Sequence, residues 1–575
     1  MSQLEPLIAD LALILICAGV MTLLFKSLKQ PIVLGYIVAG FLASPNMPYM
    51  PSVTDGHGVH VWSEIGVIFL LFALGLEFSF KKILRMGAAP IIAAMAIIMG
   101  MMYVGSLAGS LFGWSDMDCI YLGGMLAMSS TTIIFKAFDD MGLRQERFAS
   151  LVLSVLIIED ILAIVLMVML STLAVSKEFE GSQMLASIMQ LGFFLILWFV
   201  VGIYLIPLFL RKAKALMNEE TLLITALALC FGMVVFASAV GFSAAFGAFV
   251  MGSILSETVE AQKIEHLVAP VKNLFGAIFF VSVGMMVDVA LIIEYIVPIL
   301  CIIAAIMLGQ TILSTCGFLI SGQSLKTSMQ CSFSLTQIGE FAFILATLGT
   351  SLHVTSDFLY PIVVAVSVFT TFTTPYMIRL AEPAYAVVAR VLPAKWVEKL
   401  ESNASDAEEE QETNEMQKLW RTEFKKFIFI ILINSVLCVA IIGIMYYYGA
   451  PLIYGWLPDP WSGIVTALIT LAICGPFLWS LMRQGTNSEN ANKLWYEGGR
   501  IERVKSTAAG ILRLAIGAAF IAFIIGNTMP KIGIFGIFAV IAVGLLIFMS
   551  PNLEKQSNKI TKTFIDNLNE REQKQ

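Results

Sequence analysis

Long apolar segments separated by short polar segments dominate the chain. An α-helix needs roughly 20 apolar residues to cross a bilayer. This rule predicts about thirteen membrane-crossing helices before residue 380 and four more towards the C-terminus. The predicted spans lie near residues 6–26, 32–45, 62–80, 88–113, 120–138, 148–174, 186–210, 219–239, 241–256, 266–286, 291–320, 327–349 and 356–379, and then near 425–448, 462–482, 507–526 and 530–550.

The composition is that of an integral membrane protein. Hydrophobic residues make up 58% of the 575 residues and charged residues only 13%, whereas soluble domains contain about 25% charged residues. The mean hydropathy is +0.86. The net charge of −6 leaves no basic surplus for nucleic acid. Eight separate cysteines and only four histidines argue against a disulfide framework or a zinc site.

Basic residues fall in alternate loops between the predicted spans. Cytoplasmic loops of membrane proteins carry an excess of Lys and Arg. The alternation therefore predicts a multi-pass protein of the plasma or inner membrane, with its N-terminus outside and its C-terminus in the cytoplasm. The basic loops contain Lys26 and Lys29; Lys81, Lys82 and Arg85; Arg144 and Arg147; Arg211, Lys212 and Lys214; Lys263; and Lys326.

The pattern divides the chain into a large and a small membrane domain. Residues 1–380 are expected to form the first domain, and residues 381–424 a cytoplasmic linker that is acidic at 400–418. Residues 425–555 are expected to form a four-helix accessory domain, followed by a charged cytoplasmic tail at 556–575. We assign no chemistry to the accessory domain, because its predicted spans carry few polar residues.

An internal repeat relates the two halves of the first domain. A shift of 209 positions places Leu70–Glu77 on Phe279–Met286 and the polar centre of the fifth span on that of the twelfth. Equivalent spans run in opposite directions, so the predicted repeat is inverted. Inverted repeats are common in secondary transporters, which bind their substrates near the membrane midplane at discontinuous helices.

Polar clusters interrupt the fifth and twelfth spans. The clusters are Ser129, Ser130, Thr131 and Thr132 in the fifth span, and Ser334, Thr336, Gln337, Gly339 and Glu340 in the twelfth. Ser and Thr can also bond back to the carbonyls of an intact helix. Two clusters at corresponding positions instead favour two broken helices, because backbone unwinds at this depth only where it lines a cavity or is buried in protein. The half-helix ends then present dipoles to an ion.

Two adjacent acids lie near the middle of the sixth span. Glu159 and Asp160 are roughly 18–21 Å from the helix ends, against a hydrocarbon half-thickness of about 15 Å. A central acid costs about 2.5–3.5 kcal/mol unless it is paired or faces water. One interpretation is a structural carboxylate paired with a basic group. We favour a functional one, because no Lys or Arg lies deep in a neighbouring span. Neighbouring helix residues point about 100° apart, so only one acid can face a given cavity squarely.

A carboxyl group at this depth can exchange two ions. Burial favours its protonated form and a bound cation favours the carboxylate, so a proton and a cation compete for it. If the loaded group faces either side of the membrane and the empty charged group does not, the two ions exchange. This transport requires no covalent step, and no GxxxxGK[ST] nucleotide motif occurs. We therefore expect no enzyme, no catalytic residue, no cofactor and no metal beyond the transported Na⁺ or K⁺.

The chain resembles a known transporter group over about residues 5–380. Motifs of the Kef-type branch of the cation:proton antiporter-2 family are similar to Ile32–Pro45, Ile65–Glu77, Leu126–Thr132, Phe279–Met285 and Gly339–Phe343. The resemblance implies an all-α antiporter fold of about thirteen helices with two broken, crossing helices. It also implies a homodimer in which a core domain slides against a dimerisation domain.

The resemblance implies roles for individual residues. Asp160 matches the family's ion-binding Asp, and Glu159 occupies the preceding position of the same acidic pair. Ser130 and Thr131 match the first broken helix, and Glu340 matches the acidic residue of the second. With Ser129, Thr132 and Gln337, these residues are expected to support the ion site.

Three features depart from the family pattern. Glu159 stands where Kef relatives carry Gln, and Gln310 stands where relatives carry a membrane-buried Lys. Glu159 thus lacks the expected cationic partner, and we hypothesise that it is protonated or cation-paired through much of the cycle. Nothing after residue 380 resembles the soluble nucleotide-binding domain of Kef proteins, so their ligand gating is not expected here.

The sequence is compatible with three function classes. The leading one is a secondary antiporter that exchanges K⁺ or Na⁺ for protons by alternating access. The second is an acid-lined cation channel, against which the inverted repeat argues. The third is a non-transporting membrane scaffold or sensor with an antiporter-like fold, whose accessory domain binds an unknown partner. Saturable transport with protons moving opposite to the cation distinguishes the first class from the others.

Overall fold

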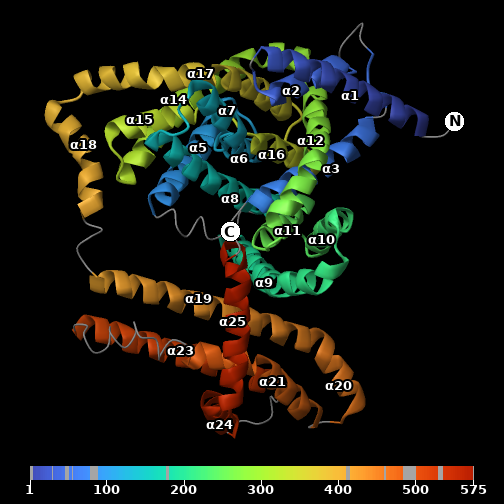
Figure 1. Ribbon diagram of the computed structural model, residues 1–575, viewed down its shortest axis with the longest axis vertical. Coiled ribbons are helices and arrows are strands. Elements are labelled where there is room, and N and C mark those ends of the chain that lie inside the picture. The colour runs from blue at the N-terminus through green and yellow to red at the C-terminus, as the bar shows by residue number, and fades with distance from the viewer. Residues whose placement is uncertain are drawn as a thin grey trace. The chain divides into compact units, whose positions relative to one another are not determined.

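The computed structural model consists of helices in two compact units (Figure 1). It describes residues 4–28, 30–45, 51–54, 56–77, 88–176, 181–409, 415–458, 461–483, 500–528 and 535–573. The first unit comprises the described residues of Met1–Ile188, Ala215–Ser256 and Glu260–Glu409, and the second those of Met189–Lys214, Glu257–Val259 and Glu410–Gln575. Every regular element in the described part of the chain is helical.

The first unit contains both halves of the predicted repeat. Its helices are α1 (Leu4–Ser27), α2 (Ile32–Ala43), α3 (Gly56–Glu77), α5 (Ala88–Leu111), α6 (Asp116–Leu126), α7 (Thr131–Met141), α8 (Arg147–Ser176), α10 (Glu219–Ala239), α11 (Ala244–Ser256), α12 (Ala261–Met285), α13 (Val289–Glu294), α14 (Ile296–Ile320), α15 (Leu325–Ser334), α16 (Glu340–Ser351), α17 (Leu359–Val391) and α18 (Ala394–Glu409).

The second unit contains most of one long helix and the C-terminal helices. They are α9 (Gly181–Ala213), α19 (Glu415–Ile444), a π-helical turn at Met445–Gly449, α20 (Ala450–Trp456), α21 (Trp461–Arg483), α23 (Arg500–Thr528), α24 (Phe535–Met549) and α25 (Pro551–Gln573). Within this unit α21 is central, since it packs against α19, α23, α24 and α25. The predicted tail begins inside α25, whose Leu553 lies against Gly475 of α21.

Thirteen helical segments among the described residues are long and apolar enough to cross a membrane, and one of them, Asp116–Asp139, is divided into α6 and α7. Two predicted spans are shorter helices, because α2 has 12 residues and α11 has 13. Of the four predicted C-terminal spans, α19, α21 and α23 reach membrane-crossing length. The described part of the fourth, α24, has 15 residues, so the four-helix accessory domain stays a prediction.

The offset of 209 positions recurs in the helices themselves. The half-helix α7 begins at Thr131, and α16 begins 209 positions later at Glu340. Serine hydroxyls cap the two preceding half-helices, Ser115 at α6 and Ser324 at α15, and these caps are also 209 positions apart. Each hydroxyl accepts a backbone N–H of the first turn, which stabilises the helix start. The predicted repeat is confirmed at the level of helix order and boundaries.

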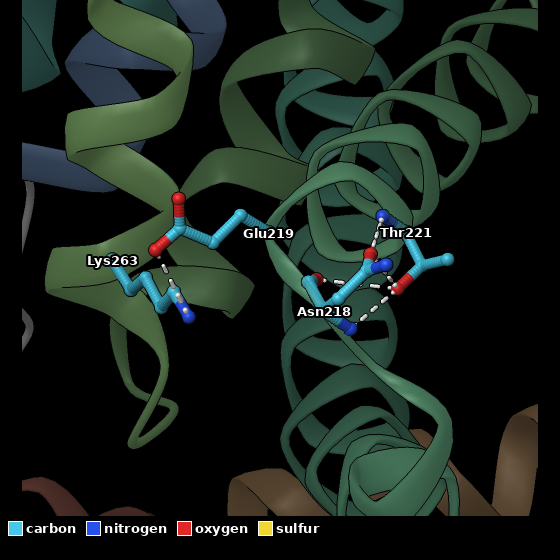
Figure 2. A network of polar contacts seen from close by, with 4 residues as sticks. All are labelled: Asn218, Glu219, Thr221 and Lys263. Atoms are coloured by element: carbon cyan, nitrogen blue, oxygen red, sulfur yellow. Dashed lines mark hydrogen bonds and ion pairs between the residues drawn. The ribbon is translucent and has the colours of Figure 1, made fainter.

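Side-chain capping and an ion pair fix the start of α10 (Figure 2). Asn218 Oδ1 accepts a hydrogen bond from the Thr221 backbone N–H at 2.8 Å, and Thr221 Oγ1 accepts one from the Asn218 N–H at 2.8 Å. This capping box satisfies two backbone donors. Lys263, near the start of α12, forms an ion pair with Glu219 at 3.5 Å. Both side chains are exposed, so the pair stabilises the fold by at most about 1 kcal/mol.

Glycines allow α2 and α12 to meet backbone to backbone. A Cβ on Gly40 of α2 would clash with the Val281 carbonyl, and a Cβ on Gly284 of α12 would clash with the Ile37 carbonyl. Small residues at helix crossings are typical of membrane proteins. Since α12 also packs against α3, and α3 against α11, these helices form one closely packed group.

The predicted linker begins as a helix. The sequence shows no apolar periodicity at 400–418, yet α18 covers Ala394–Glu409. Ala, Glu and Lys have high helix propensity, and polar contacts anchor the helix. Glu401 Oε1 accepts hydrogen bonds from the Tyr385 hydroxyl at 3.1 Å and from the Lys326 backbone N–H at 3.0 Å. Residues 410–414 lie outside the described residues, and the predicted domain boundaries stay predictions.

We expect Gly284→Ala to lower the free energy of unfolding by about 1–3 kcal/mol, because the added methyl group forces α2 away from α12. The thermal unfolding midpoint of the purified protein in detergent measures this loss. Gly19→Ala in α1 is the matched control, since no heavy atom lies within 4 Å of its added Cβ. Equal midpoints for the two variants would contradict the assigned helix crossing.

Candidate functional site

Two interrupted helices cross at their breaks in the first unit. Residues 127–130 separate α6 from α7, and residues 335–339 separate α15 from α16. The backbone N–H of Gly339 donates a hydrogen bond to the carbonyl oxygen of Met128 at 2.8 Å. The two unwound segments, one from each repeat, are therefore joined directly, and the predicted broken helices are confirmed.

Side chains satisfy further backbone groups at the crossing. Ser129 Oγ donates to the Leu335 carbonyl at 3.2 Å, and Gln337 Nε2 donates to the Ser130 carbonyl at 3.4 Å. Gly339 is required by the close approach, because a Cβ there would lie 2.5 Å from the Ser129 carbonyl oxygen. Backbone N–H and C=O groups of the unwound segments thus form hydrogen bonds within the protein, because an apolar environment offers them no other partners.

The two adjacent acids of α8 lie against the first break. Glu159 Oε2 accepts the backbone N–H of Ser129 at 3.3 Å, and Asp160 Oδ2 accepts the Thr131 hydroxyl at 3.2 Å. Glu159 is 1% exposed, whereas Asp160 is half-buried. Neighbouring positions on one helix therefore place one carboxyl inside the crossing and leave the other accessible.

Glu340 is the first residue of α16 and faces the first half-helix. Ser130 Oγ donates to Glu340 Oε2 at 3.1 Å, and Thr132 Oγ1 lies 3.5 Å from Oε1. Both α7 and α16 begin at the crossing, so the positive ends of their dipoles lie beside these carboxyl groups. Glu340 and Asp160 therefore lie beside the same helix start, since they accept the neighbouring hydroxyls of Ser130 and Thr131.

Gln310 of α14 reaches the same crossing. It is 2% exposed, and its Nε2 donates to Ser129 Oγ at 3.3 Å. Three buried oxygens here have no hydrogen-bond partner, namely Glu159 Oε1, Gln310 Oε1 and Gln337 Oε1. A buried acceptor without a donor costs about 1–3 kcal/mol. The crossing therefore has unused capacity to accept protons or a cation.

A polar face of α17 supports the second break and was missed from the sequence. Ser367 Oγ donates to the Ile338 carbonyl at 3.4 Å, and the Ile338 N–H donates to Thr370 Oγ1 at 3.4 Å. The signal was present as polar residues three or four apart in the last span before residue 380, which lie on one helix face. They are Ser367, Thr370, Thr371 and Thr374.

An ion pair between α3 and α12 was also missed. Lys272 Nζ lies 3.2 Å from Glu77 Oε1. Glu77 is the last residue of α3, and the lysines that follow it in the sequence, Lys81 and Lys82, lie outside the described residues. A lysine within the tenth predicted span was the available signal, but its partner belongs to a span nearly 200 positions away.

The arrangement can hold a hard cation or protons. Carboxyl and hydroxyl oxygens from α7, α8 and α16 converge, and such oxygens are the ligands of hard cations. Among the described residues, no group of three or more His, Cys, Asp or Glu could hold a metal ion. The site therefore provides oxygen ligands and acidic charge.

Comparison with known proteins identifies the same part of the chain. A family model described as sodium/hydrogen exchanger, transmembrane, matches residues 11–379. The chain is 30% identical to the putative cation/proton antiporter YbaL of Escherichia coli (strain K12), over 66% of the chain and 70% of the relative. It is 29% identical to the K(+)/H(+) antiporter subunit KhtU of Bacillus subtilis (strain 168), over 60% of the chain and 86% of the relative.

A plant relative and a solved structure agree with these matches. K(+) efflux antiporter 5 of Arabidopsis thaliana is 28% identical over 68% of the chain and 69% of the relative. The structure of the sodium proton antiporter MjNhaP1 from Methanocaldococcus jannaschii at pH 8 matches with a TM-score of 0.50 and 15% identity. That match covers 66% of the chain and 99% of the solved chain, and it shows a shared fold.

Gly339→Ala is expected to loosen the crossing, because its Cβ would displace the Ser129 carbonyl. That displacement would break the hydrogen bond from the backbone N–H of residue 339 to the Met128 carbonyl. Amide hydrogen exchange of peptides that cover 127–131 and 335–340 should become at least about tenfold faster, which corresponds to about 1.4 kcal/mol of local stability. Gly232→Ala in α10, with no heavy atom within 4 Å of the new Cβ, should leave both peptides unchanged. Unchanged exchange in Gly339→Ala would refute the close approach.

Proposed function

Because the chain belongs to the sodium/hydrogen exchanger family and is a cation:proton antiporter rather than an enzyme, we propose that Asp160 carries the cation and the proton in turn. One observation carries this proposal: Asp160 is the half-buried member of the acidic pair, and the Thr131 hydroxyl at the start of α7 donates a hydrogen bond to its carboxylate.

Exchange follows from competition for this carboxyl group. A proton or a monovalent cation on Asp160 neutralises its charge, and the nearby acids disfavour the empty, charged form. Moving an unpaired charge through a low-dielectric region costs several kcal/mol. The loaded site therefore changes its exposure more readily than the empty one, and the two ions move in opposite directions.

The surrounding groups hold this carboxyl in place. Ser130 and Thr132 direct their hydroxyls at Glu340, and Thr131 directs its hydroxyl at Asp160. The proposed role of Glu159 is different, because it is buried behind the first break. It serves as a second ionisable group that accepts the Ser129 N–H.

Two amides complete the polar shell at the crossing. Gln337 supports the crossing through the Ser130 carbonyl. Gln310 contributes an uncharged side chain to the crossing, and its Nε2 donates a hydrogen bond to Ser129 Oγ.

We further propose K⁺ as the cation, supported by the potassium named in K(+) efflux antiporter 5 and in the K(+)/H(+) antiporter subunit KhtU. Oxygen ligands also suit Na⁺, so both ions belong in the test. We also propose that the protein is a homodimer in the plasma or inner membrane, with its N-terminus outside and its C-terminus in the cytoplasm. Residues 425–555 are proposed to form an accessory domain that can bind a partner.

Asp160→Asn should abolish exchange while leaving the protein folded, because an amide cannot carry the proton or the charge. We would reconstitute the protein in liposomes with a trapped pH dye, impose a pH gradient, and add K⁺, Na⁺ or choline salts. The proposal is supported if K⁺ or Na⁺ dissipates the pH gradient in liposomes with wild type and does not do so with Asp160→Asn. Glu64→Gln, an exposed acid near the start of α3, is the control that should retain activity.

The same assay distinguishes the alternatives. Cation flux without opposite proton movement would favour the acid-lined channel, and a folded wild type that moves neither ion would favour the scaffold. Full exchange by Asp160→Asn would refute the assigned carrier.

Glu159→Gln should retain at least about one tenth of the wild-type exchange rate. The amide oxygen can still accept the Ser129 N–H, and its new N–H group can donate to a nearby unpaired acceptor. The dye assay measures this rate beside that of Asp160→Asn. A loss as complete as that of Asp160→Asn would show that the second acid must ionise during transport.

A further inference from the structure

Lys136 of α7 reaches across the first unit to the turn between α1 and α2. Its Nζ donates a hydrogen bond to the backbone carbonyl oxygen of Gln30 at 2.8 Å, and the two residues are 106 positions apart in the sequence. Both residues are half-buried. A charged donor forms a stronger hydrogen bond than a neutral one, and partial burial reduces competition from water. The bond therefore restrains the two segments more than an exposed surface contact would.

The bond joins two groups of helices, each with its own packing. The first group, here called the scaffold group, consists of α1, α2, α3, α10, α11 and α12. The second, here called the broken-helix group, consists of α5, α6, α7, α8, α14, α15, α16 and α17. Gln30 belongs to the scaffold group, since it lies between α1 and α2. Lys136 belongs to the broken-helix group, because α7 packs against α8 and α17.

Backbone contacts make the scaffold group rigid. In addition to the α2–α12 crossing, a Cβ on Gly75 of α3 would clash with the Phe249 carbonyl of α11, and a Cβ on Gly252 of α11 would clash with the Phe72 carbonyl of α3. Helices that meet this closely resist displacement, because closely packed interiors have little free volume. The α1–α2 turn packs into this group and gives Lys136 a fixed point.

Helix α7 connects Lys136 to the proposed ion site. Lys136 lies five residues after Thr131, about 7.5 Å along the helix axis. Thr131 donates its hydroxyl to Asp160, and Ser130, which caps α7, donates its hydroxyl to Glu340. Because a helix of 11 residues moves as one piece over this distance, a displacement of α7 at Lys136 also displaces the donors at its start.

A second contact between the groups is of a different kind. The ring of Phe280 on α12 meets the ring of Phe343 on α16, with centroids 6.3 Å apart. Apolar contact is non-directional, so these rings can slide past each other while they stay in contact. A hydrogen bond requires a short distance and a defined angle. The bond from Lys136 to Gln30 therefore fixes one position of α7 relative to the scaffold group.

We propose that Lys136 is a positioning residue for ion exchange, which holds α7 against the α1–α2 turn in the observed arrangement and releases Gln30 when the site changes its exposure. The inference rests on the proposed function of Asp160. Exchange requires the carboxyl group of Asp160 to open to one side of the membrane and then to the other. In the proposed cycle this change moves the broken-helix group relative to the scaffold group.

A reversible cross-link tests whether this movement is required. Gln30→Cys and Lys136→Cys are combined in one chain, and a short bifunctional methanethiosulfonate reagent bridges the two thiols in the liposomes. The bridge should lower the exchange rate in the dye assay at least about tenfold, because it holds the two groups together. A reducing agent should restore the rate. Bridged protein that exchanges as fast as the reduced protein would overturn the inference.

Matched controls come from the same chain. Lys263→Cys and Glu219→Cys replace the ion pair between α12 and α10 (Figure 2). A bridge there lies within the scaffold group and should leave exchange within about twofold of the unbridged rate. Gln30→Cys alone keeps the backbone carbonyl that accepts the bond. Wild type treated with the reagent controls for the exposed thiols of Cys301 and Cys316.

A second measurement requires no transport. Lys136→Met removes the bond, so amide hydrogen exchange of a peptide that covers 127–131 should become at least about threefold faster. Lys136→Arg keeps a cationic donor and should restore slow exchange. A bond that stabilises only the α1–α2 turn would instead change a peptide that covers 30–36 and leave 127–131 unchanged, and this result would overturn the inference.

The two measurements separate the inference from the proposed function. If wild type exchanges no ions, the proposed function fails, and hydrogen exchange alone decides the inference. Faster exchange at 127–131 in Lys136→Met then supports it. If wild type exchanges ions, support requires both this change and a reversible block by the bridge between positions 30 and 136.

Discussion

Backbone that leaves a helix inside a membrane must find a hydrogen-bond partner there, and this requirement governs the centre of the first unit. Each broken helix exposes carbonyl and N–H groups that lipid cannot satisfy. Neither break satisfies them alone, because the Gly339 N–H bonds to Met128 of the other repeat and Ser129 donates to Leu335. The two repeats thus satisfy each other's backbone groups at the helix crossing. The same crossing positions the acids of α8 and α16.

The crossing also explains why acids can be retained at this depth. Two half-helices begin there, and their free N–H groups favour negative charge. The hydroxyls of residues 130–132 and the backbone of Ser129 supply the nearest donors. These donors are too few for every carboxyl oxygen, as the unpaired Glu159 Oε1 demonstrates. An environment that favours acids without fully satisfying them is suited to reversible binding of a small cation.

Periodicity and repetition predicted most of the architecture from sequence. The span pattern, the shift of 209 positions and the two polar interruptions correspond to observed helices, because each arises from local composition. The Lys272–Glu77 pair and the α17 hydroxyls depend on which helices become neighbours, and apolar sequences specify that weakly. Helix α18 was missed since its anchor at Glu401 is polar and distant in sequence. The chemical roles of Asp160 and Glu159 follow from residue type and depth, and they remain proposals.

The two serine caps have a consequence for how this chain can vary. Ser115 and Ser130 start the two halves of one broken helix, and Ser324 and Gly339 occupy the matching positions of the other. Fifteen positions separate the members of both pairs. One inserted residue would rotate the residues that follow it by about 100° about the helix axis and shift them by about 1.5 Å along it. Insertions and deletions should therefore be excluded from both stretches, so that related sequences differ there by substitution alone.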